Sequence, residues 1–127
     1  MNYYEQLRDQ RQSIEEIRYE LKTNALRRSG IYAANQYLHN VLGGEERGLC
    51  GTAIVLVMPQ HDGRTKKGKA ERKTLLAMGF EKSRSGAFKR YGEYPSQSVE
   101  VKEIEARAMA DFMRREGFKA FTQVFLD

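Results

Sequence analysis

The sequence predicts an α+β protein in which an N-terminal helical arm precedes a unit of four strands and two helices. Three observations predict this class. Residues 2–42 contain no proline and are rich in strong helix formers. The run Thr52–Met58 is apolar or β-branched at every position, which is typical of a strand buried on both faces. Further along the chain, two helix-like segments each end in a Gly-Phe pair that leads into another strand.

The helical arm is expected to span residues 1–44 and to carry a narrow apolar seam. Apolar residues recur along one line of the helix at intervals of about seven residues, a pattern that favours helix pairing. Residues 3–28 are therefore a candidate surface for a homodimer. The seam consists of Tyr3, Leu7, Ile14, Ile17 and Leu21.

Two glycine-containing dipeptides are expected to limit the helices of the arm. Ser29-Gly30 is expected to break the helix, because glycine is a poor helix former. Gly43-Gly44 is expected to end it, and a polar, glycine-rich link follows.

Residues 50–127 are expected to form an α/β sandwich unit with the element order β-α-β-β-α-β. This order matches the split βαβ, ferredoxin-like arrangement with an antiparallel sheet. Many unrelated functions share that arrangement, so it identifies no function. The expected strands cover residues 52–58, 80–83, 87–91 and 118–126, and the expected helices cover residues 69–78 and 98–115.

Positive charge is concentrated in one window of the chain. Residues 61–90 hold ten lysines and arginines and three acids, a formal charge of +7, whereas the rest of the chain carries −2. A local excess of one sign attracts a partner of the opposite sign. We therefore expect an anionic partner to bind through Arg64, Lys66, Lys67, Lys69, Arg72, Lys73, Arg84, Lys89 and Arg90, with Tyr91 as a stacking residue.

The basic residues that precede the first helix of this unit have the wrong sign for a helix N-terminus, where acids are favoured. The later helix follows the usual pattern, with Glu100 near its start and Arg114 near its end. Backbone N–H groups, the helix dipole and the lysines would converge on a phosphate at the first helix, and Gly63 and Gly68 allow close approach. The alternative interpretation is a solvated loop whose charges only aid solubility.

Two partial motifs overlap this segment. Gly63, Gly68 and Lys69 have the spacing of a phosphate-binding loop, but Ala70 stands where a Ser or Thr hydroxyl would bind magnesium. Arg64, Gly68 and Ala70 also loosely resemble the Arg-x-x-Gly-x-Gly/Ala loop of the acetyl-coenzyme A-dependent N-acetyltransferases. That resemblance implies a loop whose backbone amides hold a pyrophosphate, although the helical arm replaces the strands that this family has upstream.

Residues 84–91 resemble the RNP1 strand of RNA-recognition motifs. Four positions match the pattern: Arg84, Ala87, Phe88 and Tyr91. Ser85 and Gly86 depart from it, and one stacking aromatic residue is thereby lost. In a strand, Phe88 and Tyr91 would face opposite sides. Phe88 is therefore expected in the core and Tyr91 at the surface beside the basic residues, an arrangement that binds single strands by phosphate contact and stacking.

Several classes of site are excluded by residue counts. Cys50 is the only cysteine and there are two histidines, so neither an intramolecular disulfide nor a four-ligand Cys/His zinc cluster can form. No apolar run reaches the roughly 18 residues of a membrane-spanning helix. The N-terminus lacks the basic start and apolar stretch of a secretory signal. We expect a cytoplasmic protein without a metal or cofactor.

No complete catalytic motif is present, so the sequence favours a non-enzymatic protein. The leading prediction is binding of a phosphate-bearing ligand, with nucleic acid (RNA or DNA) first, through residues 61–91. The first alternative is a small protein-binding adaptor or inhibitor, of the kind that a phage or mobile element encodes, that docks on an acidic partner. The second alternative is a transferase that binds a nucleotide or acetyl-coenzyme A.

Overall fold

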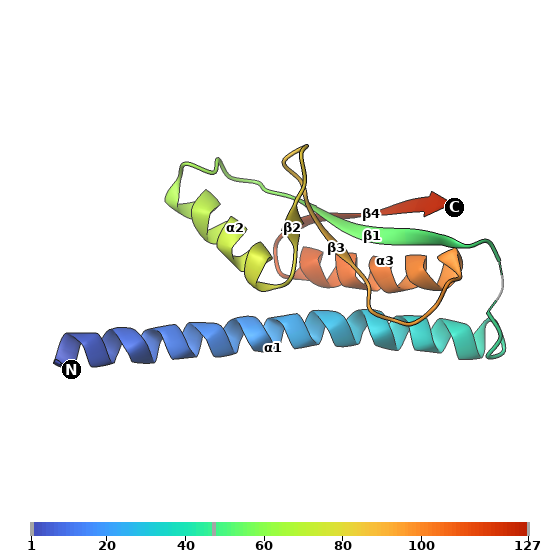
Figure 1. The fold of residues 1–127 in the computed structure, drawn as a ribbon, viewed down its shortest axis with the longest axis horizontal. Coiled ribbons are helices and arrows are strands. Elements are labelled where there is room, and N and C mark those ends of the chain that lie inside the picture. The colour runs from blue at the N-terminus through green and yellow to red at the C-terminus, as the bar shows by residue number, and fades with distance from the viewer. Residues whose placement is uncertain (1, 47, 127) are drawn as a thin grey trace.

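The structure is a computed structural model that describes residues 2–46 and 48–126. Within these residues it confirms the α+β class, with one long N-terminal helix followed by a four-stranded sheet and two further helices (Figure 1). The elements in chain order are α1 (Tyr3–Asn40), β1 (Gly51–Met58), α2 (Lys66–Ala77), β2 (Glu81–Lys82), β3 (Phe88–Tyr91), α3 (Val99–Arg115) and β4 (Lys119–Leu126).

The four strands form one antiparallel sheet in the order β2-β3-β1-β4. β4 pairs with the whole of β1, from Gly51 opposite Leu126 to Met58 opposite Lys119. β3 pairs with the other side of β1, and the two-residue strand β2 pairs with β3. β1 therefore lies inside the sheet and β4 forms one edge. The predicted hairpin at residues 80–91 is present, with strands shorter than expected.

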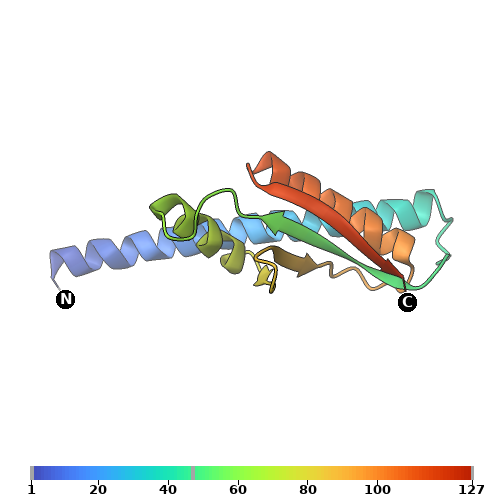
Figure 2. The same ribbon diagram turned by 90° about the horizontal axis from the view of Figure 1, so that it is seen from above.

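The sheet and the two longest helices form three layers (Figures 1 and 2). α3 packs on β1 and β4, and α1 packs on the opposite side of α3. α2 lies beyond the end of the sheet, beside α1. The main core lies between the sheet and α3, and its largest buried side chains are Leu26, Val55, Val57, Leu75, Met78, Phe88, Met109 and Met113.

β1 is fully buried on one face only, and the prediction that both faces are covered was wrong. Val55 and Val57 are 0% exposed and belong to the core cluster against α3. On the other face Ile54 is buried between its neighbouring strands, but Leu56 is only partly buried and Met58 is 38% exposed. α1 and α3 both lie on the same side of the sheet, so neither helix covers this second face (Figure 1).

Two helices end as the Gly-Phe pairs predict. Gly79 and Gly117 have φ angles of +89° and +93°, a region that glycine adopts without strain. The following N–H groups turn back onto the last helical turn, because Phe80 donates to the Leu75 carbonyl and Phe118 donates to that of Met113. Each helix is thereby stopped and the chain is directed into the next strand or turn.

α1 runs without interruption from Tyr3 to Asn40, so the predicted break at Ser29-Gly30 was wrong. Gly30 is buried where α1 meets α3. A Cβ atom at Gly30 would lie 2.7 Å from Cγ of Met109 and 2.9 Å from Cγ of Glu105. The glycine therefore permits the close approach of the two helices, and this packing outweighs its low helix propensity.

Replacing Gly30 by valine is expected to lower the free energy of unfolding by about 1–3 kcal/mol, the usual cost of overpacking a core. Met109 is 1% exposed and Glu105 is 2% exposed, so neither has room to move aside. Urea denaturation of the full chain measures the change. The matched control is Gln12→Val at an exposed position of the same helix. Equal stability of the Gly30→Val variant and the wild-type protein would contradict the proposed role of this glycine.

Candidate functional site

The loop between β1 and α2 is tied to α2 by hydrogen bonds. The Glu71 carboxylate accepts from the backbone N–H groups of Gln60 and His61, at 3.0 and 3.2 Å. The guanidinium of Arg72 donates to the His61 carbonyl at 2.9 Å and to that of Gly68 at 3.0 Å. These bonds hold the loop in a defined shape, and they engage Arg72 inside the fold.

The first turn of α2 is capped by its own loop. The Thr65 hydroxyl accepts from the Gly68 N–H at 3.0 Å, and the Thr65 carbonyl accepts from the Lys69 N–H. A Cβ atom at Gly68 would lie 1.8 Å from the Asp62 carbonyl oxygen, so only glycine fits there. The amides of Gly68 and Lys69 are therefore bonded within the protein.

Asp62 and Arg64 form an ion pair beside this turn. The Asp62 carboxylate accepts from the Arg64 backbone N–H at 2.8 Å and from its guanidinium at 3.0 and 3.2 Å. The hydrogen bonds from the Arg64 side chain, and then that from its backbone, hold the pKa of Asp62 below its ordinary value. Arg64 thus has an anionic partner within the chain.

Two further residues that were predicted to bind the anionic partner contact other parts of the protein instead. Lys73 forms an ion pair with Glu15 of α1, at 3.2 Å. Arg90 is 8% exposed, and its guanidinium donates to the Met78 carbonyl at 3.0 Å and lies 3.5 Å from the Glu93 carboxylate. Lys73 therefore joins α2 to α1, and Arg90 joins β3 to the end of α2.

The remaining cations of α2 and the β2–β3 turn are free. Lys66, Lys67, Lys69 and Arg84 are exposed, and none of their side chains forms a hydrogen bond or ion pair with a described residue. In Figure 1 the β2–β3 turn stands above the sheet, on the side away from α3, and α2 begins at that level before descending towards α1. The backbone segments that carry the free cations therefore reach the level of the uncovered face of the sheet, with α2 beyond the sheet end.

The uncovered face of the sheet carries aromatic rings beside lysines. Strand alternation places Lys89 and Tyr91 of β3 on this face, since Phe88 and Arg90 are buried on the other. The register places Lys119, Phe121 and Phe125 of β4 on the same face. The Lys89 ammonium lies 5.8 Å from the centre of the Tyr91 ring, and that of Lys119 lies 5.9 Å from the centre of the Phe121 ring. We name Lys89, Tyr91, Lys119, Phe121 and Phe125 the open aromatic face.

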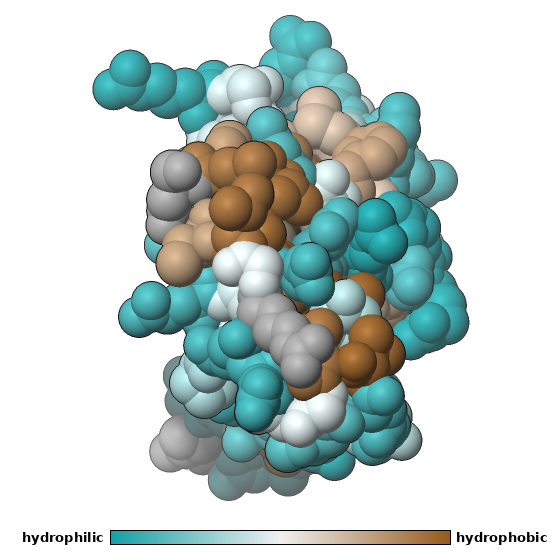
Figure 3. Space-filling model, turned by 90° about the vertical axis from the view of Figure 1, so that its right-hand side faces the viewer, coloured by the Kyte–Doolittle hydropathy of each residue, from teal (hydrophilic) through white to brown (hydrophobic). Residues whose placement is uncertain are grey.

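The three β4 residues of the open aromatic face were missed in the sequence. Their signal is the alternation of lysine, phenylalanine, glutamine and phenylalanine at residues 119, 121, 123 and 125. The end of the molecule where β1 begins and β4 finishes shows apolar patches separated by hydrophilic surface (Figure 3). Phe125 and Leu126, at that end of β4, are 47% and 61% exposed.

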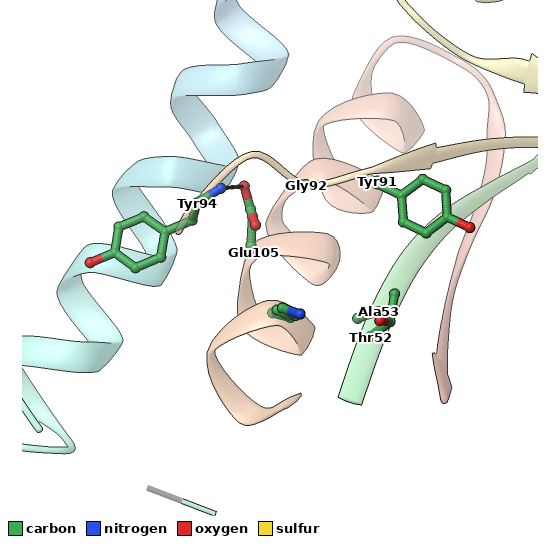
Figure 4. Close-up of a pocket in the computed structure, with 7 residues that line it drawn as sticks. Thr52, Ala53, Tyr91, Gly92, Tyr94 and Glu105 are labelled. Atoms are coloured by element: carbon green, nitrogen blue, oxygen red, sulfur yellow. Dashed lines mark hydrogen bonds between the residues drawn. The ribbon is translucent and has the colours of Figure 1, made fainter. Parts of the chain in front are cut away.

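A small pocket of about 160 Å³ lies beneath the end of β3 (Figure 4). The most buried polar residue that lines it is Glu105, which is 2% exposed. One oxygen of this carboxylate accepts from the backbone N–H groups of Glu93 and Tyr94, at 2.7 and 2.9 Å. A Cβ atom at Gly92 would lie 2.0 Å from the other oxygen, so a larger residue there would have to displace this buried carboxylate. Glu105 therefore fixes the loop after β3 onto α3.

Two other kinds of feature are absent from residues 2–46 and 48–126. No helix there has the length and apolar content needed to cross a bilayer. No three side chains among the described His, Cys, Asp and Glu residues are grouped so that they could hold a metal ion.

Comparison of the chain with known protein families, with curated proteins and with solved structures finds no match. We therefore infer the function from the geometry and chemistry of the surface itself.

The stabilising contact of Asp62 is expected to weaken in acid. Because the fold lowers the pKa of Asp62, its contribution is complete above the ordinary value of 3.8 and is lost as the pH falls through the lower pKa of the folded state. Thermal unfolding of the wild-type protein and of Asp62→Asn, followed from neutral pH downwards, should show a stability difference that is constant near neutrality and shrinks below that value. A difference independent of pH would contradict the assignment.

Proposed function

We propose that this protein binds nucleic acid without catalysing a reaction. One observation carries the proposal. The segments that bear the free cations, α2 and the β2–β3 turn, reach the same side of the molecule as the open aromatic face. Phosphate groups are attracted by lysines and arginines, and bases stack on aromatic rings. The residues that would contact phosphates are Lys66, Lys67, Lys69, Arg84 and Lys89, with Tyr91 as a stacking residue.

The distribution of these cations favours a polymer over a single phosphate. They come from the first turn of α2, from the β2–β3 turn and from β3, so no one small anion could contact them all. At the helix start, Gly68 and Lys69 donate their amides to Thr65, so neither of these two amides is available to a nucleotide or acetyl-coenzyme A. A chain of phosphates is the ligand that can contact exposed positive charges on several separate segments.

We also propose that residues 50–127 are a variant of the ferredoxin-like arrangement. The order of elements along the chain, β1-α2-β2-β3-α3-β4, supports this. The placement of α2 departs from a regular sandwich of helices on a sheet, because α2 lies beyond the sheet end and reaches α1 through the Lys73–Glu15 ion pair. This proposal concerns the fold and does not by itself support the binding function.

A second candidate function, association with another protein chain, is supported by α1. The first turns of this helix extend past the rest of the molecule, and α2 lies beside the turns that follow (Figures 1 and 2). It exposes the seam that the sequence predicts, with Ile14, Ile17 and Leu21 at 52%, 55% and 61% exposure. A stripe of exposed apolar side chains along one side of a helix suits a partner helix, and we propose a second copy of this chain as that partner.

Nucleic-acid binding is expected to depend strongly on salt. Five phosphate contacts to a single strand predict that log Kd rises with log salt concentration with a slope of about 3.5, since each contact contributes about 0.7. Reversing three of them in Lys66→Glu/Lys67→Glu/Lys69→Glu should reduce the slope to about 1.4 and weaken binding at least about 100-fold at roughly 0.1 M salt. Fluorescence anisotropy with a labelled oligonucleotide measures both quantities.

A matched control for charge is Lys22→Glu/Arg28→Glu/Arg115→Glu. These exposed residues lie on α1 and at the end of α3, away from the open aromatic face, and the control makes the same change in net charge. It should retain most of the affinity. If the wild-type protein shows no binding at low salt, or if both triple variants lose the same affinity, nucleic-acid binding through the α2 lysines is wrong.

The seam on α1 predicts a dimer that a single charge disrupts. Light scattering of the wild-type protein should give about twice the chain mass of 14.7 kDa, and Ile17→Glu should give the mass of one chain. A glutamate at this position would place a charge in an apolar interface without a partner. Gln12→Glu, on the opposite side of the same helix, should leave the dimer intact. A wild-type mass of one chain at high protein concentration would exclude this candidate.

A further inference from the structure

We infer that the preferred ligand is single-stranded nucleic acid whose bases stack on Tyr91, Phe121 and Phe125. This inference rests on the proposed function and specifies its ligand class and its site. It assigns a binding role to two residues of β4 that lie outside the basic window of the sequence.

The three rings are exposed on the same face of the sheet. Tyr91, Phe121 and Phe125 are 51%, 42% and 47% exposed. Tyr91 lies opposite Ile54, and Ile54 lies opposite Gln123 on its other side. Phe121 lies two residues before Gln123 and Phe125 lies two residues after it, so the strand rise separates the two phenylalanines by roughly 13 Å. Each of them is about 12 Å from Tyr91 across the sheet. The rings are far enough apart for separate bases to lie on each.

The charges on this face suit an anionic ligand. Lys89 and Lys119 each lie two residues before an exposed ring on the same strand, with the ammonium groups 5.8 and 5.9 Å from the ring centres. Glu81 is the only acid among the described strand residues that face this side, and it lies opposite Lys89. A base that stacks on Tyr91 or Phe121 therefore brings its phosphate close to a lysine.

A single strand matches this arrangement better than a duplex does. The flat faces of the bases are available for stacking only when they are unpaired, since a duplex buries them between neighbouring base pairs. A second copy of the sheet would bring the lysines of two faces together, with Glu81 as the only acid among the described strand residues of each face. The pairing of each ring with a lysine thus favours a ligand that is both flat and negatively charged.

The test compares three probes on the full chain: a labelled oligothymidylate, its duplex with oligoadenylate, and an abasic phosphodiester of the same length. The oligothymidylate should bind about 5- to 150-fold more tightly than the abasic strand, the range that stacking of one base provides. Phe121→Ala and Tyr91→Ala should each remove much of this advantage. Tyr32→Ala, at a 67% exposed position of α1, should leave it unchanged.

Tryptophan fluorescence supplies a second measurement that is independent of affinity. The chain contains no tryptophan, so Phe121→Trp introduces a single reporter and keeps a ring at the site. Oligothymidylate should quench its emission, whereas the abasic strand should not. Tyr32→Trp provides the control reporter, and its emission should not respond to either strand.

The outcomes separate this inference from the proposed function. Binding of all three probes with equal affinity, unchanged in Phe121→Ala and Tyr91→Ala, would leave nucleic-acid binding in place and overturn stacking on the open aromatic face. Failure to bind any probe would overturn both. If Phe121→Ala instead halves the solution mass without changing affinity for oligothymidylate, the face joins two copies of the chain and the inference is wrong.

Discussion

The close packing of α1 on α3 at Gly30 is the constraint on which the rest of the structure depends. It brings the two helix backbones together, and it places Glu105 where its carboxylate can accept hydrogen bonds from Glu93 and Tyr94. α3 is then covered on both sides, by the sheet and by α1. Because α1 packs on α3 and not on the sheet, the far side of the sheet has no helical cover, and the aromatic and basic residues of β3 and β4 face outwards.

The cations of the basic window divide into those that build the fold and those that it leaves free. Arg72 shapes the loop before α2, Lys73 joins α2 to α1, and Arg90 joins β3 to the end of α2. Each of these contacts fixes the position of α2, and α2 carries Lys66 and Lys69 at its start. The structural cations therefore act indirectly on any ligand, because they orient the segment from which the free lysines project.

The helices, the strands and the Gly-Phe endings could be predicted from local sequence patterns, because helix capping and hydrophobic periodicity depend on residues that are close together in the sequence. The role of Gly30 could not, since it depends on α3, which is distant in the sequence. For the candidate site, residues 61–91 contain the free cations, but charge counts cannot tell Arg90, which is buried, from Lys89, which faces outwards. Phe121 was missed because the side of the sheet that a β4 residue faces depends on its register with β1, and composition does not reveal that register.

β4 combines features that would be unfavourable in a protein with no partner. It is an edge strand of eight residues, and it exposes Phe121, Phe125 and other apolar side chains. Edges of this kind invite pairing with other chains, and lysines on or near them oppose it. Lys119 occupies such a position on β4. Lys119 and Lys89 each lie over an aromatic ring of the same face. Their charge disfavours the approach of a second copy of the same surface, but it favours a ligand that presents phosphates together with flat bases. The same side chains thus limit self-association and select an anionic, aromatic partner.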